Sequence, residues 1–318
     1  AAAVGSLAGS ATYPAQELAD AWFLLALNMD RNTLWGAAVD APFTDERSWD
    51  ARDRFDFVDA VARAAFRSGI EALGEGRAGE VTLFNPVNGS PRSPVELVLP
   101  EGRVPADLPC QVLGDGRTVL AEVALPSVGV TSVRTTSMRP GVKPPARWGA
   151  PGPIETDDYV AAIDPDTGAL TSLVLKRSGR EMLGGPANVI LCEAESQVHR
   201  LPSKSQRRLV GSSNEFRPVF SVTRGDVATV VEVQSAFHGG GVLRRTMRFY
   251  HRSPRIDFVT ETNGLPAWTI LSAEFPWADD VAVMRGGIPY GISVTAHDGG
   301  ASGIHPVIHW SHYAFAKG

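Results

Sequence analysis

Residues 227–262 read VATVVEVQSAFHGGGVLRRTMRFYHRSPRIDFVTET, and this stretch decides the class of fold. Val, Thr, Phe and other strand-forming residues dominate two runs, 227–237 and 242–250, which are separated by HGGG at 238–241. β-Branched and aromatic residues favour strands, and a short glycine-rich connection is typical of a hairpin turn. A third run, 255–262, comes close to strict alternation of apolar and polar residues. We therefore predict three consecutive antiparallel strands in one sheet.

Strand chemistry extends over most of the chain after Gly79, in short runs separated by Gly, Pro, Asn and Asp. Further expected strands are 81–84, 95–99, 118–124, 128–135, 159–163 and 169–175. The last two flank the turn sequence DPDTG at 164–168, which predicts a second hairpin. So many antiparallel strands predict a mainly β chain with a large antiparallel β-supersandwich, because packed sheets bury their faces without many helices.

At the start of the chain, the apolar residues have the spacing of a helix rather than of a strand. Between 12 and 29, Leu18, Trp22, Leu25 and Met29 recur at three- and four-residue steps, which predicts an amphipathic helix with these side chains on its buried face. A second helix is expected from about 48 to 73, with Phe55 and Phe66 on its apolar stripe. We therefore expect a helical segment of a bundle over 1–78 and a β domain over 79–318, with a candidate subdivision at the Pro/Gly-rich stretch 139–153.

Composition excludes some classes of function. The formal net charge is −5, and no segment carries an unopposed excess of Lys and Arg, so we expect no nucleic-acid partner. No apolar run approaches the roughly 18–20 residues of a membrane helix, so we expect no membrane partner. Cys110 and Cys192 lie far apart, which predicts two buried free thiols and leaves the compartment undecided. The apolar start, 1–11, has no basic segment before it, and this slightly favours a cytoplasmic over a secreted protein.

Three stretches, in this order, carry a resemblance to a known family. They are YPAQEL at 13–18 with LN at 27–28 and GAA at 36–38; VTLFNP at 81–86 with SPR at 90–92; and DPDTGALTSL at 164–173 with RIDF at 255–258 and EFP at 274–276. Together they resemble glycoside hydrolase family 38, the α-mannosidase-like enzymes, over most of the chain. The resemblance implies a helical middle domain followed by a galactose-mutarotase-like β-supersandwich, normally behind an amino-terminal α/β barrel.

In that family the barrel carries the nucleophilic aspartate, the acid/base carboxylate and two or three zinc ligands. A retaining glycosidase needs two carboxylates about 5 Å apart, and we find no such pair in this sequence, so we assign no catalytic residue. The chain begins at Ala1 without a methionine. We therefore expect the middle and carboxyl-terminal part of a glycosidase, inactive alone, whose partners are the catalytic barrel and carbohydrate.

The resemblance also implies a site in the helical part. Aligned on Asn28 and Gly36, Arg31 takes the place of a zinc-binding histidine of the family, and Asn32 that of the neighbouring aspartate. A guanidinium has no lone pair for a metal, so we assign no metal ligand and expect no cofactor in this chain. Asp30 could supply an oxygen to zinc only if the helix rotated. Instead we predict a substrate-binding set made of Asp30, Arg31, Asn32 and Trp35. An ion pair between Asp30 and Arg31 that locks the turn before Trp35 is an equal alternative.

Other candidate features are weighed against structural explanations. His305, His309 and His312 have metal-like spacing, but Pro306 and the apolar residues around them favour a strand, on which the three would not share a face. Four tryptophans could stack on sugars, although we expect them to pack instead; they are Trp148, Trp268, Trp277 and Trp310. Two alternatives to the glycosidase part remain: a free-standing carbohydrate-binding or scaffold module, and, less favoured, a mutarotase-like epimerase.

Overall fold

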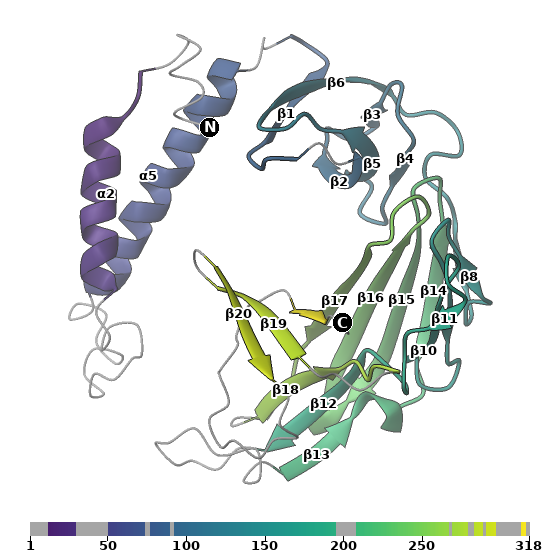
Figure 1. Ribbon diagram of the computed structural model, residues 1–318. Coiled ribbons are helices and arrows are strands. Elements are labelled where there is room, and N and C mark those ends of the chain that lie inside the picture. The colour runs from purple at the N-terminus through teal and green to yellow at the C-terminus, as the bar shows by residue number, and fades with distance from the viewer. Residues whose placement is uncertain are drawn as a thin grey trace. The chain divides into compact units, whose positions relative to one another are not determined.

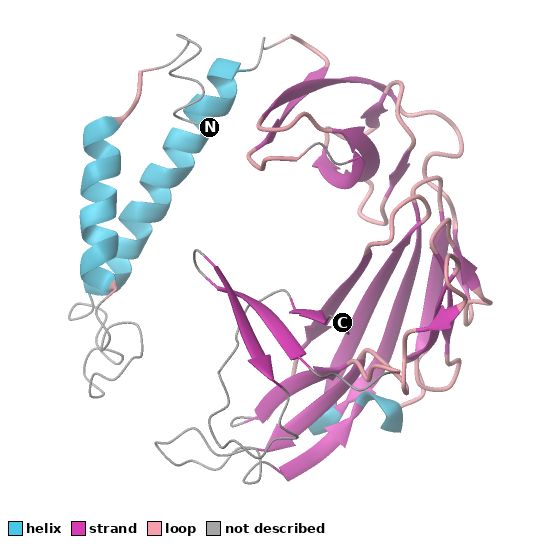
Figure 2. Ribbon diagram, in the orientation of Figure 1, coloured by secondary structure: helices cyan, strands magenta, loops and turns pink. Residues whose placement is uncertain are grey.

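The computed structural model of the chain is mainly β, with its helices before its strands (Figures 1 and 2). It describes residues 12–29, 50–73, 77–89, 92–194, 208–266, 269–278, 283–288, 291–296 and 313–315. The chain divides into two compact units, Ala1–Arg139 and Pro140–Gly318, and the division falls at the start of the Pro/Gly-rich stretch 139–153. The predicted fold class is confirmed: two helices at the start, then many antiparallel sheets.

Among the described residues of the first unit, two helices, α2 (Ala15–Asn28) and α5 (Asp50–Leu73), lie side by side (Figure 1). Their buried side chains are small, except for Asn28: Ala21 on α2, and Ala51, Ala65 and Gly69 on α5. The apolar stripe predicted from the large residues is confirmed only in part, since Leu18 and Leu25 are half-buried but Trp22, Phe55 and Phe66 are exposed. Small side chains allow two helices to approach closely, so the seam follows the small residues.

A buried amide ties the end of α2 to the start of α5. Asn28 is fully buried, and its Nδ2 donates to the carbonyl oxygen of Ala51 at 2.8 Å. Its Oδ1 accepts from Arg54 Nε at 2.6 Å. Both ends of the amide are therefore satisfied, as a buried polar group requires. In the described part of the chain, neither helix combines the length and the apolar character that crossing a bilayer demands.

The strands of the first unit form two three-stranded sheets. One has the order β1-β6-β3, from Glu80–Asn85, Gly129–Ser137 and Arg103–Pro105. The other has the order β2-β5-β4, from Arg92–Val98, Thr118–Ala124 and Cys110–Val112. Asn85 ends β1 in a turn, where its Nδ2 donates to the carbonyl oxygens of Gly89 and Pro126 at 2.9 and 2.7 Å. The Asn-Pro sequence therefore closes this turn through its side chain.

The second unit contains a five-stranded sheet of order β17-β16-β15-β14-β7. Its strands are β7 (Ala146–Trp148), β14 (Val219–Arg224), β15 (Ala228–Phe237), β16 (Gly241–Tyr250) and β17 (Ile256–Thr262). The strands β15, β16 and β17 are the three strands predicted from 227–262, and they pair antiparallel to one another in sequence order. The HGGG turn is a short 3₁₀ turn, His238–Gly240, with positive φ at Gly239 and Gly240.

The described residues of the second unit also form three smaller sheets. The order β11-β10-β9-β8 joins Arg180–Glu181, Leu170–Leu175, Tyr159–Ile163 and Ile154–Glu155. The order β13-β12-β18 joins Arg208–Ser212, Val189–Ala194 and Thr269–Glu274. The order β20-β19-β21 joins Gly291–Ala296, Val283–Ile288 and Tyr313–Phe315.

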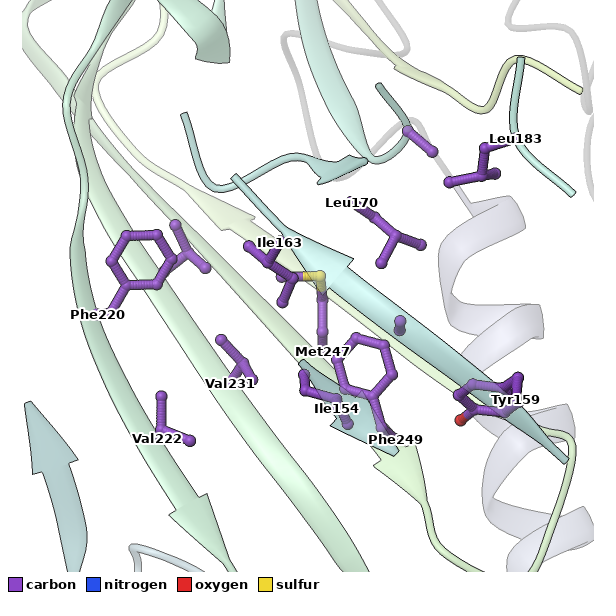
Figure 3. Packing of buried hydrophobic residues seen from close by; sticks show 13 residues of the cluster. Ile154, Tyr159, Ile163, Leu170, Leu183, Phe220, Val222, Val231, Met247 and Phe249 are labelled. Atoms are coloured by element: carbon purple, nitrogen blue, oxygen red, sulfur yellow. The ribbon is translucent and has the colours of Figure 1, made fainter. Parts of the chain in front are cut away.

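One face of the five-stranded sheet forms the core of the second unit. It packs on the four-stranded sheet, and side chains from both sheets point toward one another in Figure 3. The four-stranded sheet supplies Ile154, Tyr159, Ile163 and Leu170, and the five-stranded sheet supplies Phe220, Val222, Val231, Met247 and Phe249. Farther along the same face, Phe237 and Leu243 pack on Ile190 and Cys192 of β12. The two sheets make a sandwich, and the opposite face of the long sheet is left outside it.

The DPDTG turn joins β9 to β10, as predicted, and it is anchored to the core. Asp164 Oδ1 accepts from the backbone N–H of Asp166 at 2.8 Å, and Gly168 follows with φ +71°. The buried Arg245 donates from Nη2 to the carbonyl oxygen of Thr167 at 2.6 Å. Cys110 and Cys192 are both buried and free, which confirms that prediction.

Candidate functional site

The site residues inferred from the family resemblance, Asp30, Arg31, Asn32 and Trp35, lie outside the described residues. Their proposed contact with substrate therefore stays a prediction. The same holds for the three histidines at 305, 309 and 312. Among the residues that the structure does describe, no group of three or more His, Cys, Asp or Glu side chains is arranged to hold a metal ion.

Trp148 lies on the surface of the second unit. Its side chain is 78% exposed, so it does not pack in the core of this unit. The reason is local: β7 has only three residues, all exposed, at the edge of the five-stranded sheet. Trp277 is 39% exposed, and Trp268 and Trp310 lie outside the described residues.

Alternation along β15 builds the face on which Trp148 lies. Val231, Val233 and Phe237 point into the core, while Glu232 and Gln234 between them are exposed. Successive side chains of a strand point to opposite faces, and residues paired across strands share a face. The outward face of the sheet therefore follows from the burial pattern and the register.

The register arranges the outward side chains in rows across the sheet. One row runs Trp148, Ser221, Glu232 and Thr246, because Trp148 pairs with Ser221, Ser221 with Glu232, and Glu232 with Thr246. In the next row, the pairing of the strands places Val219 beside Gln234, Gln234 beside Arg244, and Arg244 beside Glu261. An aromatic ring at one edge thus adjoins polar side chains that donate hydrogen bonds, accept them or do both.

The residues of these rows other than Thr246 and Glu261 line an open groove with a volume of about 700 Å³. They are Trp148, Val219, Ser221, Glu232, Gln234 and Arg244, and the glycine turn before Val242 also contributes to the lining. Arg244 Nη2 approaches Gln234 Oε1 at 3.5 Å, a long contact that leaves most donors of the guanidinium for a ligand. We call this surface the Trp148 groove.

A second polar cluster, at the turn between β16 and β17, is structural. Tyr250 donates its hydroxyl to Asp257 Oδ2 at 2.8 Å, and Arg255 donates to both oxygens of Asp257 at 2.6 and 2.9 Å. Burial, and next the Asp257 carboxylate, raise the pKa of Tyr250 to about 12. Tyr250 therefore stays protonated as a donor at neutral pH, and the cluster fastens the two strands together.

Sequence reasoning missed Ser221, Glu232, Gln234 and Arg244. A signal for two of them was present, because alternation in 227–237 puts Glu232 and Gln234 opposite the apolar side chains. Trp148 had no such signal, since a three-residue strand inside a Pro/Gly-rich stretch shows no period. No model of a known protein family matches the chain, and no curated protein matches it.

Proposed function

We propose that this chain is the middle and carboxyl-terminal part of an α-mannosidase-like glycoside hydrolase, and that it binds carbohydrate without cleaving it alone. The observation that carries the binding part is the Trp148 groove. A pyranose ring has an apolar C–H face and a rim of hydroxyls. An exposed indole offers a flat apolar surface, and nearby polar side chains fix the orientation of the ligand.

The family part of the proposal is supported by where the resembling stretches fall in the fold. The VTLFNP stretch is β1 followed by the turn that Asn85 closes. The DPDTG stretch is the turn between β9 and β10, and Arg255 and Asp257 form the cluster at the start of β17. These two stretches thus have definite structural roles in a chain of the expected mainly β class.

Bond cleavage is assigned to a partner. A retaining glycosidase reaction needs a nucleophile and an acid/base carboxylate about 5 Å apart across the scissile bond. In the proposal these belong to an amino-terminal barrel of the same parent protein, beside the predicted set at 30–35. We expect the chain alone to give no turnover of an aryl α-mannoside, with or without added zinc.

A free-standing carbohydrate-binding module is the second candidate. It is favoured by one observation: every residue of the Trp148 groove comes from the second compact unit, between 148 and 244. The groove therefore needs no residue from the helical part. Both candidates share carbohydrate binding and differ only in whether a catalytic barrel accompanies the chain.

Replacing Trp148 tests the carbohydrate binding that both candidate functions share. We expect the chain to bind a mannose-containing oligosaccharide in calorimetric titration, and Trp148→Ala to weaken that binding about thirtyfold. Truncating a tryptophan hot spot costs about 2 kcal/mol, and about 1.4 kcal/mol is tenfold in Kd. Trp22→Ala is the matched control, because Trp22 is also exposed but lies on α2.

Two outcomes would contradict the proposal. One is a chain that binds no glycan on a broad array that includes mannans. The other is unchanged affinity in Trp148→Ala. Circular dichroism of both variants checks that the fold is kept, which we expect because both side chains are mostly exposed.

A further inference from the structure

We infer that the Trp148 groove selects neutral glycans over anionic ones, through Glu232 and Arg244 acting together on neighbouring hydroxyls of one sugar. The inference rests on the proposed carbohydrate binding and adds the class of ligand. Four observations on the described residues carry it: the register, the exposure of the charged groups, their hydrogen-bonding capacities, and the charges around Arg244.

The register brings Glu232 and Arg244 close on the outward face. Glu232 pairs with Thr246 of β16, and Gln234 pairs with Arg244, so Glu232 and Arg244 are diagonal neighbours on β15 and β16. Diagonal neighbours of an antiparallel pair lie about 7–8 Å apart, within reach of long side chains that meet on a common ligand. Both side chains are exposed and both line the groove.

The two groups have opposite hydrogen-bonding capacities. A carboxylate only accepts, and a guanidinium only donates. A sugar hydroxyl does both, so two adjacent hydroxyls can donate to Glu232 and accept from Arg244 at the same time. Gln234, which lies beside Arg244, adds an amide that donates and accepts. The set therefore matches a neutral polyol.

An anionic sugar would meet the wrong charge. Its carboxylate or sulfate would be drawn to Arg244, but Glu232 lies diagonally on one side of Arg244, and Glu261 of β17 pairs with Arg244 on the other. Two carboxylates therefore flank Arg244 itself, while the other diagonal neighbour of Glu232, Arg248, pairs with Asp257 farther along the sheet. Like charges this close disfavour an anion, and a neutral ligand avoids that cost.

A matched pair of ligands tests this selectivity on the full chain. Mannotriose and the mannuronate trimer of the same linkage differ by a carboxylate in place of the hydroxymethyl group of each ring. We expect mannotriose to bind at least about tenfold more tightly, since the anion loses one hydrogen bond and gains a repulsion. We also expect the affinity for mannotriose to change less than about twofold between about 50 mM and about 500 mM salt, because a neutral ligand has no charge to screen.

Glu232→Gln tests the residue that the selectivity needs. The substitution keeps the shape, and the side chain is exposed, so the fold is expected to be unchanged. We expect mannotriose to bind about tenfold more weakly, because hydrogen bonds to a charged group are the stronger ones, and the preference over mannuronate to narrow. Glu215→Gln in the 3₁₀ turn Ser213–Glu215 is the control with the same change outside the groove.

The outcomes separate the inference from the proposed function. If no glycan of either charge binds, the proposed function fails and the inference fails with it. If mannuronate binds as tightly as mannotriose or more tightly, with affinity that falls in salt, carbohydrate binding stands and the neutral selectivity is wrong. If Glu232→Gln binds both ligands as the unaltered chain does, the role given to Glu232 is wrong.

Discussion

Gly168 is a residue of the second unit at which both the backbone conformation and the packing exclude a side chain. Its φ of +71° lies in the left-handed region, where a side chain other than hydrogen is strained. A Cβ built at this position would lie 2.4 Å from Val233 Cγ1 and 2.7 Å from Arg245 Nη2. The hydrogen of Gly168 therefore allows the turn to sit directly on the core of the sandwich.

Gly168→Ala should lower the free energy of unfolding of the second unit by about 2–4 kcal/mol. About 1–2 kcal/mol of this comes from the left-handed backbone and the rest from overpacking against Val233. Denaturant titration of the variant measures the loss. Gly240→Ala is the control, because Gly240 also has a positive φ of +80° but no atom within 4 Å of its ideal Cβ. Equal losses in the two variants would show that packing at Gly168 contributes nothing.

At the scale of elements, several strands of five residues or more were predicted, but the shortest strands and the six-residue strands β12, β14 and β18 were not. The predicted runs 118–124 and 159–163 coincide with β5 and β9, and 227–237 differs from β15 by one residue. These strands are long enough for composition and alternation to be visible. Strands of two or three residues, such as β7 and β8, carry no period and were missed.

The helices show why burial was harder to predict than helix formation. The spacing of the apolar residues predicts both helices. The size of these side chains alone does not show which apolar stripe of each helix forms the contact between the helices. The structure places Ala and Gly in the seam and leaves the large aromatic residues exposed. For the same reason the buried Asn28 gave no sequence signal, because its role depends on a carbonyl 23 positions away.

Asn28→Ala should destabilise the pair of helices by about 1–3 kcal/mol. The substitution leaves the carbonyl oxygen of Ala51 and Nε of Arg54 without this partner in a buried place. Hydrogen exchange of the α2 amides should become faster. Gln16→Ala, which removes an exposed contact with Asp20 on the same helix, should leave the exchange of these amides nearly unchanged. Equal exchange in the two variants would contradict the structural role of Asn28.

At the scale of the whole molecule, the second unit contains everything that the Trp148 groove needs. The groove residues and both buried clusters beneath the long sheet lie within Pro140–Gly318. The side chains that shape the groove therefore depend on packing inside one unit. The candidate site at 30–35, in contrast, rests on the family resemblance alone.

A fragment of residues 140–318 should therefore bind glycan with a Kd within about twofold of that of the full chain. Sites without shared partners contribute independently to within a few tenths of a kcal/mol. Calorimetric titration of the fragment and the chain with the same oligosaccharide provides the comparison, with Trp148→Ala in the fragment as the control. A folded fragment that fails to bind would assign part of the site to residues before 140.

The short length of the edge strand β7 affects how easily this strand detaches from the sheet. Only Ala146, Arg147 and Trp148 pair with β14, so detaching this strand breaks few backbone hydrogen bonds and leaves the sandwich core in place. Short edge segments open with a small free energy, independently of global unfolding. A ligand stacked on Trp148 would have to be released before the strand detached. Occupancy of the groove should therefore slow the local opening of β7, and the exchange rates of its amides become a reporter of binding.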